Sequence, residues 1–267
     1  MATSLPFSPY FFNAVPHPPP PPPPTTTTTT AATTATMTTP TIVHGEQGGG
    51  GSSLSSQPDV ELRVQPRPQP CSLPIVLGSS SGYRRRIMDS LGWEFSTASP
   101  DVDEKAIRDP DPRKMCAEIA RVKARALAER LDKPAVLITA DQVCLFDEGH
   151  GRGEEVREKP ESVEEAKAFL RSYSCRSVKT LSALCVTNLD TGRAAEGVHE
   201  STVSWREISP AVVDDVIARG NVMGSAGGFA LEEPGLRSLV GKIEGSVDSV
   251  LGLPVELLCT LVERATA

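Results

Sequence analysis

Cysteine motifs, long apolar runs and a net positive charge are all missing from this chain. Its six cysteines are scattered without CxxC spacing, which argues against a structural zinc site and a disulfide framework and favours a reducing compartment. No apolar stretch approaches the length needed to cross a bilayer, so no membrane partner is expected. The formal net charge of -7 gives no reason to expect nucleic acid as a partner.

Common nucleotide-binding motifs and central histidines are also missing. The chain has no GxxxxGK[ST], which excludes a P-loop enzyme, and the glycines at 224–228 do not follow a strand with the dinucleotide fingerprint. Only His150 and His199 lie beyond the low-complexity N-terminal segment. Any bound metal is therefore expected to take oxygen ligands, which indicates Mg²⁺ or Mn²⁺.

The first 72 residues differ in composition from the rest. Runs of proline and then threonine occupy 18–30, and a Gly/Ser patch follows near 48–53. Such a segment cannot bury enough apolar surface to offset chain entropy, so we predict a disordered tail over 1–72 and one folded domain over 73–267.

Two functional interpretations of this tail stay open. It is rich in Ser and Thr like a transit peptide, but no arginine precedes Arg63, so we expect a cytoplasmic protein and leave organellar targeting as the alternative. The proline run could dock on an aromatic groove of a partner, which the sequence does not identify.

Within the domain, apolar periodicity alternates between strands and helices. Strands are predicted at 73–81, at 93–99, at 133–146, in a hairpin over 178–208 that turns at 190–192, and within 236–246. Helices are predicted at 83–92, at 112–131, from Ser162 to about 172, from Ser209 to Gly220, and from Pro254 onward. The helix at 112–131 has an apolar stripe of Met115, Ile119, Val122 and Ala126. The helix that ends near 172 opens with a capping box of Ser162 and Glu165. The fold class is therefore α/β, with a mixed twisted sheet and flanking helices.

Acidic residues mark two candidate positions. Asp141 interrupts the apolar run 133–146, where an ionised carboxylate is costly unless it is paired, binds metal or lies at the mouth of the strand, where α/β sheets bind ligands. A simple turn cap is the alternative. Asp101, Asp103 and Glu104 follow in one loop, where alternate residues of an extended chain would share a face, although a solvated acidic loop is the plainer interpretation.

Basic side chains complement these acids. Arg84 and Arg85 lie near the start of a predicted helix, where free N–H groups and the helix dipole favour an anion. Lys123 lies on the long helix and Lys159 precedes a proline, and each alone would be ordinary surface charge. Combined with Ser79 at the strand-to-helix turn and with the acids, they could hold a polyphosphate and a divalent cation.

Seven segments follow one another in a characteristic order, namely LGSSSGYRRRIMDSLG, SPDVDEK, RVKARA, LITADQVCLFD, EKPESVEEA, GSAGGFALEE and EGSVDSVLGLP. This order resembles that of the Maf family, nucleotide pyrophosphatases first associated with septum formation. The chain resembles this family over 74–264. The resemblance implies a Maf/ITPase-like fold of two lobes around a deep cleft, often paired as a homodimer. It also implies cleavage of nucleoside triphosphates to monophosphate and pyrophosphate.

The resemblance also implies roles for individual residues. Asp141 resembles the proton acceptor of the family, and Glu104 resembles a carboxylate that helps to hold the divalent metal beside it. The phosphate-binding positions of the family match Ser79, Arg84, Arg85, Lys123 and Lys159.

Three positions bear on the nucleotide base. The UTP/dTTP branch of the family usually has Thr after the catalytic acid and Gln in the later glycine-rich loop, whereas the 7-methyl-GTP branch has Gln and Glu. This chain has Gln142 and Glu232. A carboxylate suits the paired N–H donors of guanine, and Tyr83 offers an aromatic face to a cationic methylated base or is simply a packing residue.

The resemblance departs from the family pattern in two places. A second acid and a proline follow Glu232, so Glu233 is an alternative reader of the base, and Gly82 replaces a usual proline. We expect hydrolysis of 7-methyl-GTP or another modified nucleotide. The alternatives are UTP/dTTP hydrolysis and a catalytically weak, nucleotide-binding regulator of cell division.

Overall fold

One mixed sheet organises the residues that the structure describes. The computed structural model describes residues 64–131, 134–149, 151 and 153–267. The strands are β1 (Ile75–Gly78), β2 (Phe95–Thr97), β3 (Val136–Asp147), β4 (Glu154–Arg157), β5 (Ser177–Asn188), β6 (Ala194–Trp205) and β7 (Val240–Glu244). Their order is β2-β1-β3-β5-β6-β7, and β4 pairs with β3. Because β1 runs parallel to β2 and β3 while β3, β5 and β6 are antiparallel, the predicted mixed sheet is confirmed.

Local signals in the sequence set the main helices. They are α1 (Gly82–Leu91), α2 (Pro112–Ala128), α3 (Val163–Tyr173), α4 (Pro210–Arg219), α5 (Pro234–Arg237), α6 (Val247–Val250) and α7 (Val255–Thr266), with 3₁₀ turns η1 (Glu104–Ala106) and η2 (Ala226–Gly228). Gly92 ends α1 in the left-handed region at φ 73°, where a glycine has no steric penalty. In the described part of the chain, no helix combines the length and the hydropathy that a membrane span requires.

The predicted capping box forms only in part. The Ser162 hydroxyl accepts a hydrogen bond from the Glu165 N–H at 3.1 Å, as the motif requires. The Glu165 carboxylate, however, accepts from the N–H of Glu161 at 2.6 Å. The start of α3 is therefore tied to the loop before it, which borders the cavity described below.

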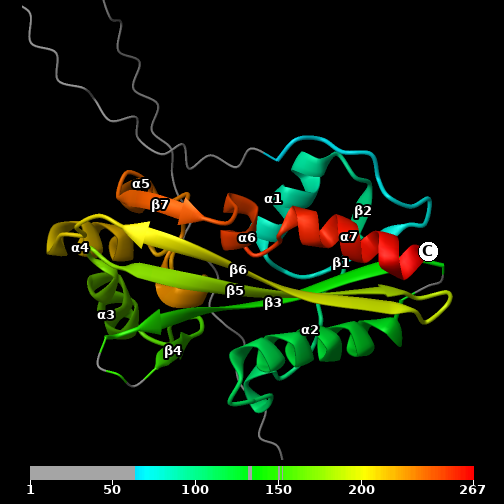
Figure 1. Ribbon diagram of the computed structural model, residues 1–267, viewed down its shortest axis with the longest axis horizontal. Helices are drawn as coiled ribbons and strands as arrows, with labels where there is room; N and C mark the ends of the chain where they lie inside the picture. The colour runs from blue at the N-terminus through cyan, green and yellow to red at the C-terminus, as the bar shows by residue number, and fades with distance from the viewer. Residues whose placement is uncertain (1–63, 132–133, 150, 152) are drawn as a thin grey trace, which may run out of the picture. The chain divides into compact units, whose positions relative to one another are not determined.

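Helices cover both faces of the sheet. In Figure 1, α2 lies on one face and α1, α6 and α7 lie on the other. Each face of the sheet has its own hydrophobic core, and β3 contributes side chains to both of them. It does so because successive side chains of a strand point to opposite faces. Leu137 and Val143 pack with α2, whereas Ile138 and Ala140 pack in the core on the other face. This two-sided burial explains the nearly continuous apolar run in the sequence.

The buried side of α2 differs from the predicted stripe. Met115 and Ile119 are buried as expected, but Val122 and Ala126 are only partly buried. The buried residues are Met115, Cys116, Ile119, Ala120, Lys123, Ala124 and Leu127. The stripe is rotated because the helix turns Lys123 towards the sheet, where its ammonium meets two acids.

The folded domain begins earlier than predicted. The backbone N–H of Arg67 donates to the Leu91 carbonyl at 3.1 Å, and the Trp93 indole N–H donates to the Arg67 carbonyl at 3.0 Å. Val64 and Cys71 pack against the core. Residues 64–72 therefore belong to the domain, which corrects the predicted boundary. The rest of the predicted tail, 1–63, lies outside the described residues.

Candidate active site

The sheet leaves a gap beside the middle of β3. On the edge of β3 opposite β5, strand β1 ends with Gly78 paired to Thr139. Strand β4 pairs farther along the same edge, where its last residue, Arg157, is opposite Cys144. Among the described strands, none therefore pairs with residues 140–143 on that edge. The predicted acid, Asp141, thus lies in the interior of β3 and not at its end, and it reaches a ligand-accessible mouth because β1 is short.

A cavity of about 800 Å³ opens at this gap. The turn before α1, the η1 segment, β3, the β4–α3 loop, the η2 loop and α6 all contribute to its walls. Eight of the predicted site residues line it, namely Ser79, Tyr83, Arg84, Glu104, Lys123, Asp141, Gln142 and Lys159. The fold therefore gathers in one cavity residues that are spread over 81 positions of sequence, counted from the first to the last of them.

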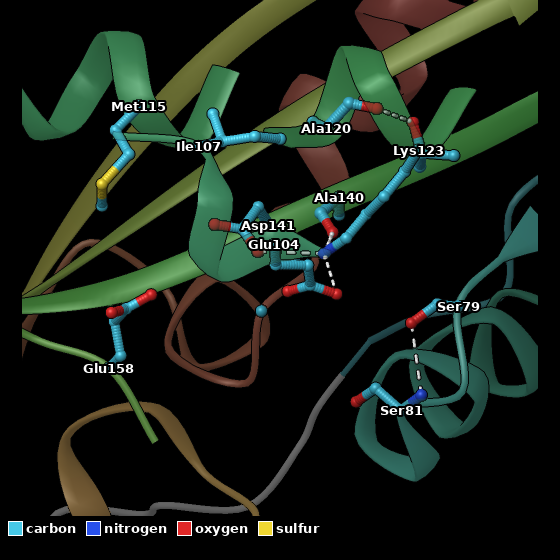
Figure 2. A network of polar contacts seen from close by, with 12 residues as sticks. Ser79, Ser81, Glu104, Ile107, Met115, Ala120, Lys123, Ala140, Asp141 and Glu158 are labelled. Atoms are coloured by element: carbon cyan, nitrogen blue, oxygen red, sulfur yellow. Dashed lines mark hydrogen bonds and ion pairs between the residues drawn. The ribbon is translucent and has the colours of Figure 1, made fainter. Parts of the chain in front are cut away.

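Lys123 lies at the centre of the charged cluster in this cavity. Its ammonium donates to Asp141 Oδ1 at 3.0 Å and to the Ala140 carbonyl at 3.4 Å. It also pairs with Glu104 Oε1 at 3.0 Å. Figure 2 shows the ammonium between the two carboxylates, with Asp141 on β3 and Glu104 on η1. The exposed fractions of the Lys123 and Asp141 side chains are only 6% and 10%, so this is a nearly buried ion pair.

Arg84 anchors the opposite wall through backbone carbonyls. Its Nε donates to the Gly252 carbonyl at 2.8 Å, and its Nη1 donates to the Ala140 carbonyl at 3.0 Å and to Ser79 Oγ at 3.4 Å. Burial lowers the pKa of this guanidinium, while the charges of Asp141 and Glu104 act in the opposite direction. The planar fork is therefore fixed beside the gap, where a phosphate would meet it.

From the resemblance to the Maf family, we expect that replacing Arg84 with lysine raises KM for a nucleotide substrate about 10-fold or more, because an ammonium cannot reproduce bonds made by a planar guanidinium. We expect a smaller change in kcat. Steady-state kinetics of pyrophosphate release would measure both constants. The matched variant is Arg85→Lys, which should change KM less because Arg85 is exposed and does not line the cavity. Equal losses in the two variants would contradict this assignment.

Gln142 is held by its amide nitrogen. Nε2 donates to Ser182 Oγ at 3.0 Å and to the carbonyls of Ser249 and Val250, each at 3.1 Å. The amide oxygen lies close to Gly252, where an added Cβ would come within 3.1 Å of it. The three hydrogen bonds of the nitrogen therefore fix the Gln142 side chain at the wall of the cavity.

The thiol nearest to Asp141 is not a nucleophile. Cys116 is fully buried on α2. Burial raises the pKa of its thiol well above the usual value, and the negative charge of Asp141 raises it further. A thiol in this state stays protonated at neutral pH, and only a thiolate attacks efficiently. The cluster is therefore suited to general-base chemistry by the carboxylate.

The acidic loop does not adopt the extended conformation that would place alternate acids on one face. Residues 104–106 form η1, and the Asp103 side chain accepts a hydrogen bond from the Lys105 N–H at 3.2 Å. As a result Asp103 and Glu104 line the cavity, whereas Asp101 is exposed and does not. The turn aims Glu104 at Lys123, an arrangement that alternation could not predict.

Ion pairs join the two rims of the cavity. Lys105 pairs with Glu161, and Arg108 pairs with Glu158 at 3.0 Å. These side chains connect the η1 segment to the loop before α3. Glu158 had no predicted role, because a single glutamate in a loop carries no specific signal in a sequence.

Two predicted residues lie outside the lining of the cavity. Arg85 is exposed on α1. Glu232 is also exposed, and its carboxylate pairs with Arg86. The alternative reader, Glu233, is buried with an exposed side-chain fraction of 0% and is bound to Arg219. Glu233 therefore has a structural partner.

Carboxylates outnumber basic groups around this cavity. Among the described lining residues, seven are acidic and four are basic. A polyphosphate ligand, as expected from the sequence, would therefore need additional positive charge in order to bind. No group of three Asp, Glu, His or Cys side chains in the described residues is placed to hold a metal on its own. Glu104 and Asp141 nevertheless converge on one cation, Lys123, and Mg²⁺ commonly binds one or two carboxylates together with substrate phosphates.

The sequence did not predict the backbone carbonyls that take part in the site. The Ala140 carbonyl accepts hydrogen bonds from Arg84 and Lys123, and the Gly252 carbonyl accepts one from Arg84. Every residue has a carbonyl, so no residue type marks such a role. The segment EGSVDSVLGLP, which contains Gly252, was the available signal.

Comparisons with known proteins show which family the chain is similar to. The family described as Maf-like protein matches residues 74–265. The chain is similar to a 7-methyl-GTP pyrophosphatase of Dictyostelium discoideum, with 36% identity over 202 residues that cover 73% of this chain and 98% of the relative. It is similar to a 7-methyl-GTP pyrophosphatase of Nitrosococcus oceani, with 30% identity, covering 74% of this chain and 96% of the relative.

A solved structure with a more distant likeness is a nucleoside-triphosphatase (dITP/XTP pyrophosphatase) from Mycobacterium abscessus. It is 13% identical, with a TM-score of 0.31, and the match covers 50% of this chain and 73% of that chain. At this level the likeness carries no inference about activity. The family match over residues 74–265 and the identity to the two relatives show that the chain belongs to the Maf family.

Proposed function

We propose that this protein hydrolyses nucleoside triphosphates to nucleoside monophosphate and pyrophosphate, with 7-methyl-GTP as the preferred substrate. The observation that carries the proposal is the cluster of Asp141, Glu104 and Lys123 in a cavity that Arg84 and the start of α1 also border. The names of the two relatives support the same activity.

The proposed reaction is attack of water on the α-phosphorus. Asp141 orients the water and takes its proton, a contribution of roughly 10²- to 10⁴-fold in general-base catalysis. The bond from the α-phosphorus to the bridging oxygen breaks, and pyrophosphate leaves with the electron pair. Arg84, Lys123 and Lys159 line the cavity and neutralise charge on the phosphates, which is usually the larger contribution in phosphoryl chemistry.

Lys123 has to exchange partners when a nucleotide binds. In the structure its ammonium is shared by Asp141, Glu104 and the Ala140 carbonyl. A phosphate oxygen competes for the same donors, which frees the Asp141 carboxylate to face water. Glu104 has an exposed side-chain fraction of 43%, so it can move more easily than Asp141.

Glu104 and Asp141 are the residues that would hold a divalent cation. When bound, Mg²⁺ or Mn²⁺ would supply positive charge to the phosphates, in line with the excess of carboxylates around the cavity. The two acids orient towards one shared position already taken by the Lys123 ammonium.

The preference for a methylated guanine is supported by the names of the two relatives. Gln142 follows the proposed general base in the sequence, and its amide nitrogen fixes the side chain at the wall of the cavity. We expect this side chain to contact the nucleotide.

Pyrophosphate release tests the proposal directly. The purified chain is incubated with Mg²⁺ and with 7-methyl-GTP, GTP or UTP in separate reactions. We expect kcat/KM for 7-methyl-GTP to exceed that for UTP by at least about 10-fold, a difference of about 1.4 kcal/mol. Faster release from UTP would contradict the preference, and release from none of the three would favour a nucleotide-binding regulator.

A further inference from the structure

Arg157 is a buried cation that has no part in the proposed reaction. It is the last residue of β4, and the exposed fraction of its side chain is only 3%. Its guanidinium carbon lies 4.1 Å from the ring centre of Phe146, 4.6 Å from that of Phe169 and 5.1 Å from that of Tyr173. An enclosed charge is costly unless it is paired, so the fold has to supply partners for this guanidinium.

Hydrogen bonds fix the orientation of the guanidinium among these rings. Its Nε donates to Glu155 Oε2 at 2.9 Å, and its Nη1 donates to Ser172 Oγ at 2.6 Å. Nη2 also pairs with Glu155 Oε2 at 2.9 Å. Because the fork is planar, these partners together allow it one orientation. The side chain therefore ties the end of β4 to the last turn of α3.

Two residues of the cavity follow Arg157 directly in the chain. Glu158 and Lys159 line the cavity, and Pro160 comes next. A proline fixes its own φ and restricts the residue before it to an extended backbone. The backbone of Lys159 is thus restrained by Pro160 on one side and by Arg157, two residues away, on the other. Because the lysine side chain is long and exposed, its reach into the cavity depends on this backbone.

The aromatic cluster also ties this segment to the η2 loop. The Gly227 N–H donates to the Glu158 carbonyl at 2.9 Å. The Gly227 carbonyl accepts from the Tyr173 hydroxyl at 2.9 Å, and the Tyr173 ring contacts Arg157. Gly227 has φ 70°, and an added Cβ would come within 2.6 Å of Cys144 Sγ, so the loop needs glycine here. A closed circuit of contacts therefore runs from Arg157 through Tyr173 and Gly227 back to the β4–α3 loop.

We propose that Arg157 is a positioning residue, which holds the backbone of Lys159 so that its ammonium meets the phosphates of a bound nucleotide. The identity of this ligand rests on the proposed function, whereas the contacts of Arg157 do not depend on it. A lysine that binds phosphate in the ground state and in the transition state contributes uniform binding. Loss of its position should therefore raise KM more than it lowers kcat.

Arg157→Met removes the fork and keeps the packing. Methionine is flexible and packs well against aromatic rings, and Glu155 remains solvated because half of its side chain is exposed. The ligand is a GTP analogue with a methylene group between the α- and β-phosphorus, which cannot be cleaved there. Calorimetry with Mg²⁺ should give a Kd about 5- to 10-fold above that of the parent, as for the loss of one charge-assisted contact. KM for a hydrolysed triphosphate should rise by a similar factor, and kcat should change less than about 3-fold.

A double variant shows whether Arg157 acts through Lys159. Lys159→Met should itself weaken binding of the analogue. The double variant Arg157→Met/Lys159→Met should bind it within about 2-fold of Lys159→Met, because a lysine that is absent cannot be positioned. Losses that multiply in the double variant would overturn the proposal, since Arg157 would then act on the ligand independently of Lys159.

Arg176→Met is the matched control. The Arg176 guanidinium carbon lies 4.6 Å from the centre of the same Phe146 ring, and its Nη2 donates to the Asp147 carbonyl. Arg176 is exposed and does not line the cavity. Its replacement removes one positive charge near the same ring, and Kd for the analogue should stay within about 2-fold of the parent. An equal loss in both variants would contradict a specific role of Arg157.

Hydrogen exchange at the Gly227 amide measures the positioning without any ligand. Arg157→Met should raise its exchange rate about 10-fold or more, because the circuit that holds this amide against Glu158 is opened. Tyr173→Phe removes only the hydroxyl of the circuit and should also raise the rate. Thermal unfolding of each variant shows whether it is folded, and Tyr173→Phe decides the question if Arg157→Met is not. Unchanged exchange in the folded variants would overturn the proposal.

The positioning role and the proposed function can fail separately. If the chain releases no pyrophosphate from any triphosphate, the proposed function fails. Gly227 exchange and binding of the analogue still decide whether Arg157 positions the Lys159 segment. Conversely, normal analogue binding by a folded Arg157→Met variant would overturn the positioning role, even in a chain that hydrolyses 7-methyl-GTP.

Discussion

Replacing Asp141 with asparagine should lower kcat for pyrophosphate release by at least about 10²-fold, the lower end of what a general base contributes. Nucleotide binding should persist, because the amide oxygen can still accept a hydrogen bond from Lys123, and Arg84 is untouched. In calorimetry without a divalent cation, Kd should stay the same or fall, because the variant removes a negative charge beside the phosphates. Pyrophosphate release gives kcat, and calorimetry with the same nucleotide gives Kd.

The control for this variant is Asp101→Asn. Asp101 belongs to the acidic loop, but it is exposed and does not line the cavity. Its replacement should leave both constants close to those of the parent chain. Near-normal turnover in Asp141→Asn would remove this carboxylate from the reaction. Loss of binding in parallel with turnover would assign it to ligand binding and not to proton transfer.

Replacing Lys123 with methionine should destabilise the fold as well as abolish efficient turnover. The substitution leaves Asp141 nearly buried without its cation, and breaking a buried ion pair in this way costs about 3–5 kcal/mol. We expect the free energy of unfolding to fall by about 3 kcal/mol, at the lower end of this range because the open cavity admits water. The corresponding fall in Tm is roughly 6–12 °C for a domain of this size. Thermal and denaturant unfolding measure these changes.

The double variant Lys123→Met/Asp141→Asn separates charge from packing. Once the acid is neutral, the uncompensated charge is gone, so part of the lost stability should return. Wild-type stability in Lys123→Met would show that the ion pair does not hold in solution. A double variant less stable than Lys123→Met by the full effect of Asp141→Asn would show that the two residues do not interact.

Local chemistry explains which features could be predicted from the sequence. Gly92 and Ser209 mark helix ends through interactions within a few residues, and the hairpin of β5 and β6 turns where Asp190 and Gly192 indicate it. Asp141 could be identified as a candidate because an ionised carboxylate inside an apolar run is costly unless it is paired or binds a ligand. Each signal depends only on neighbouring residues.

The arrangement of the arginines could not be predicted in this way. Successive residues of a helix point about 100° apart, so Arg84, Arg85 and Arg86 face different directions. Arg84 reaches the carbonyls of Ala140 and Gly252, Arg85 is exposed, and Arg86 pairs with Glu232. The sequence indicated an anion for this cluster, but only the fold shows that one of the three lines the cavity.

The sequence by itself determined the α/β class and the main helix ends, because these follow from periodicity and capping. Residue chemistry and the resemblance to the Maf family together predicted eight residues that the fold brings to the cavity. The tertiary structure alone decided that Asp141 borders the cavity at the gap between β1 and β4, that Lys123 is buried between two acids, and that the Gln142 amide nitrogen binds Ser182 and the carbonyls of Ser249 and Val250. The physical reason is that these features depend on hydrogen bonds and ion pairs between segments far apart in the chain, and such contacts leave no local pattern in the sequence.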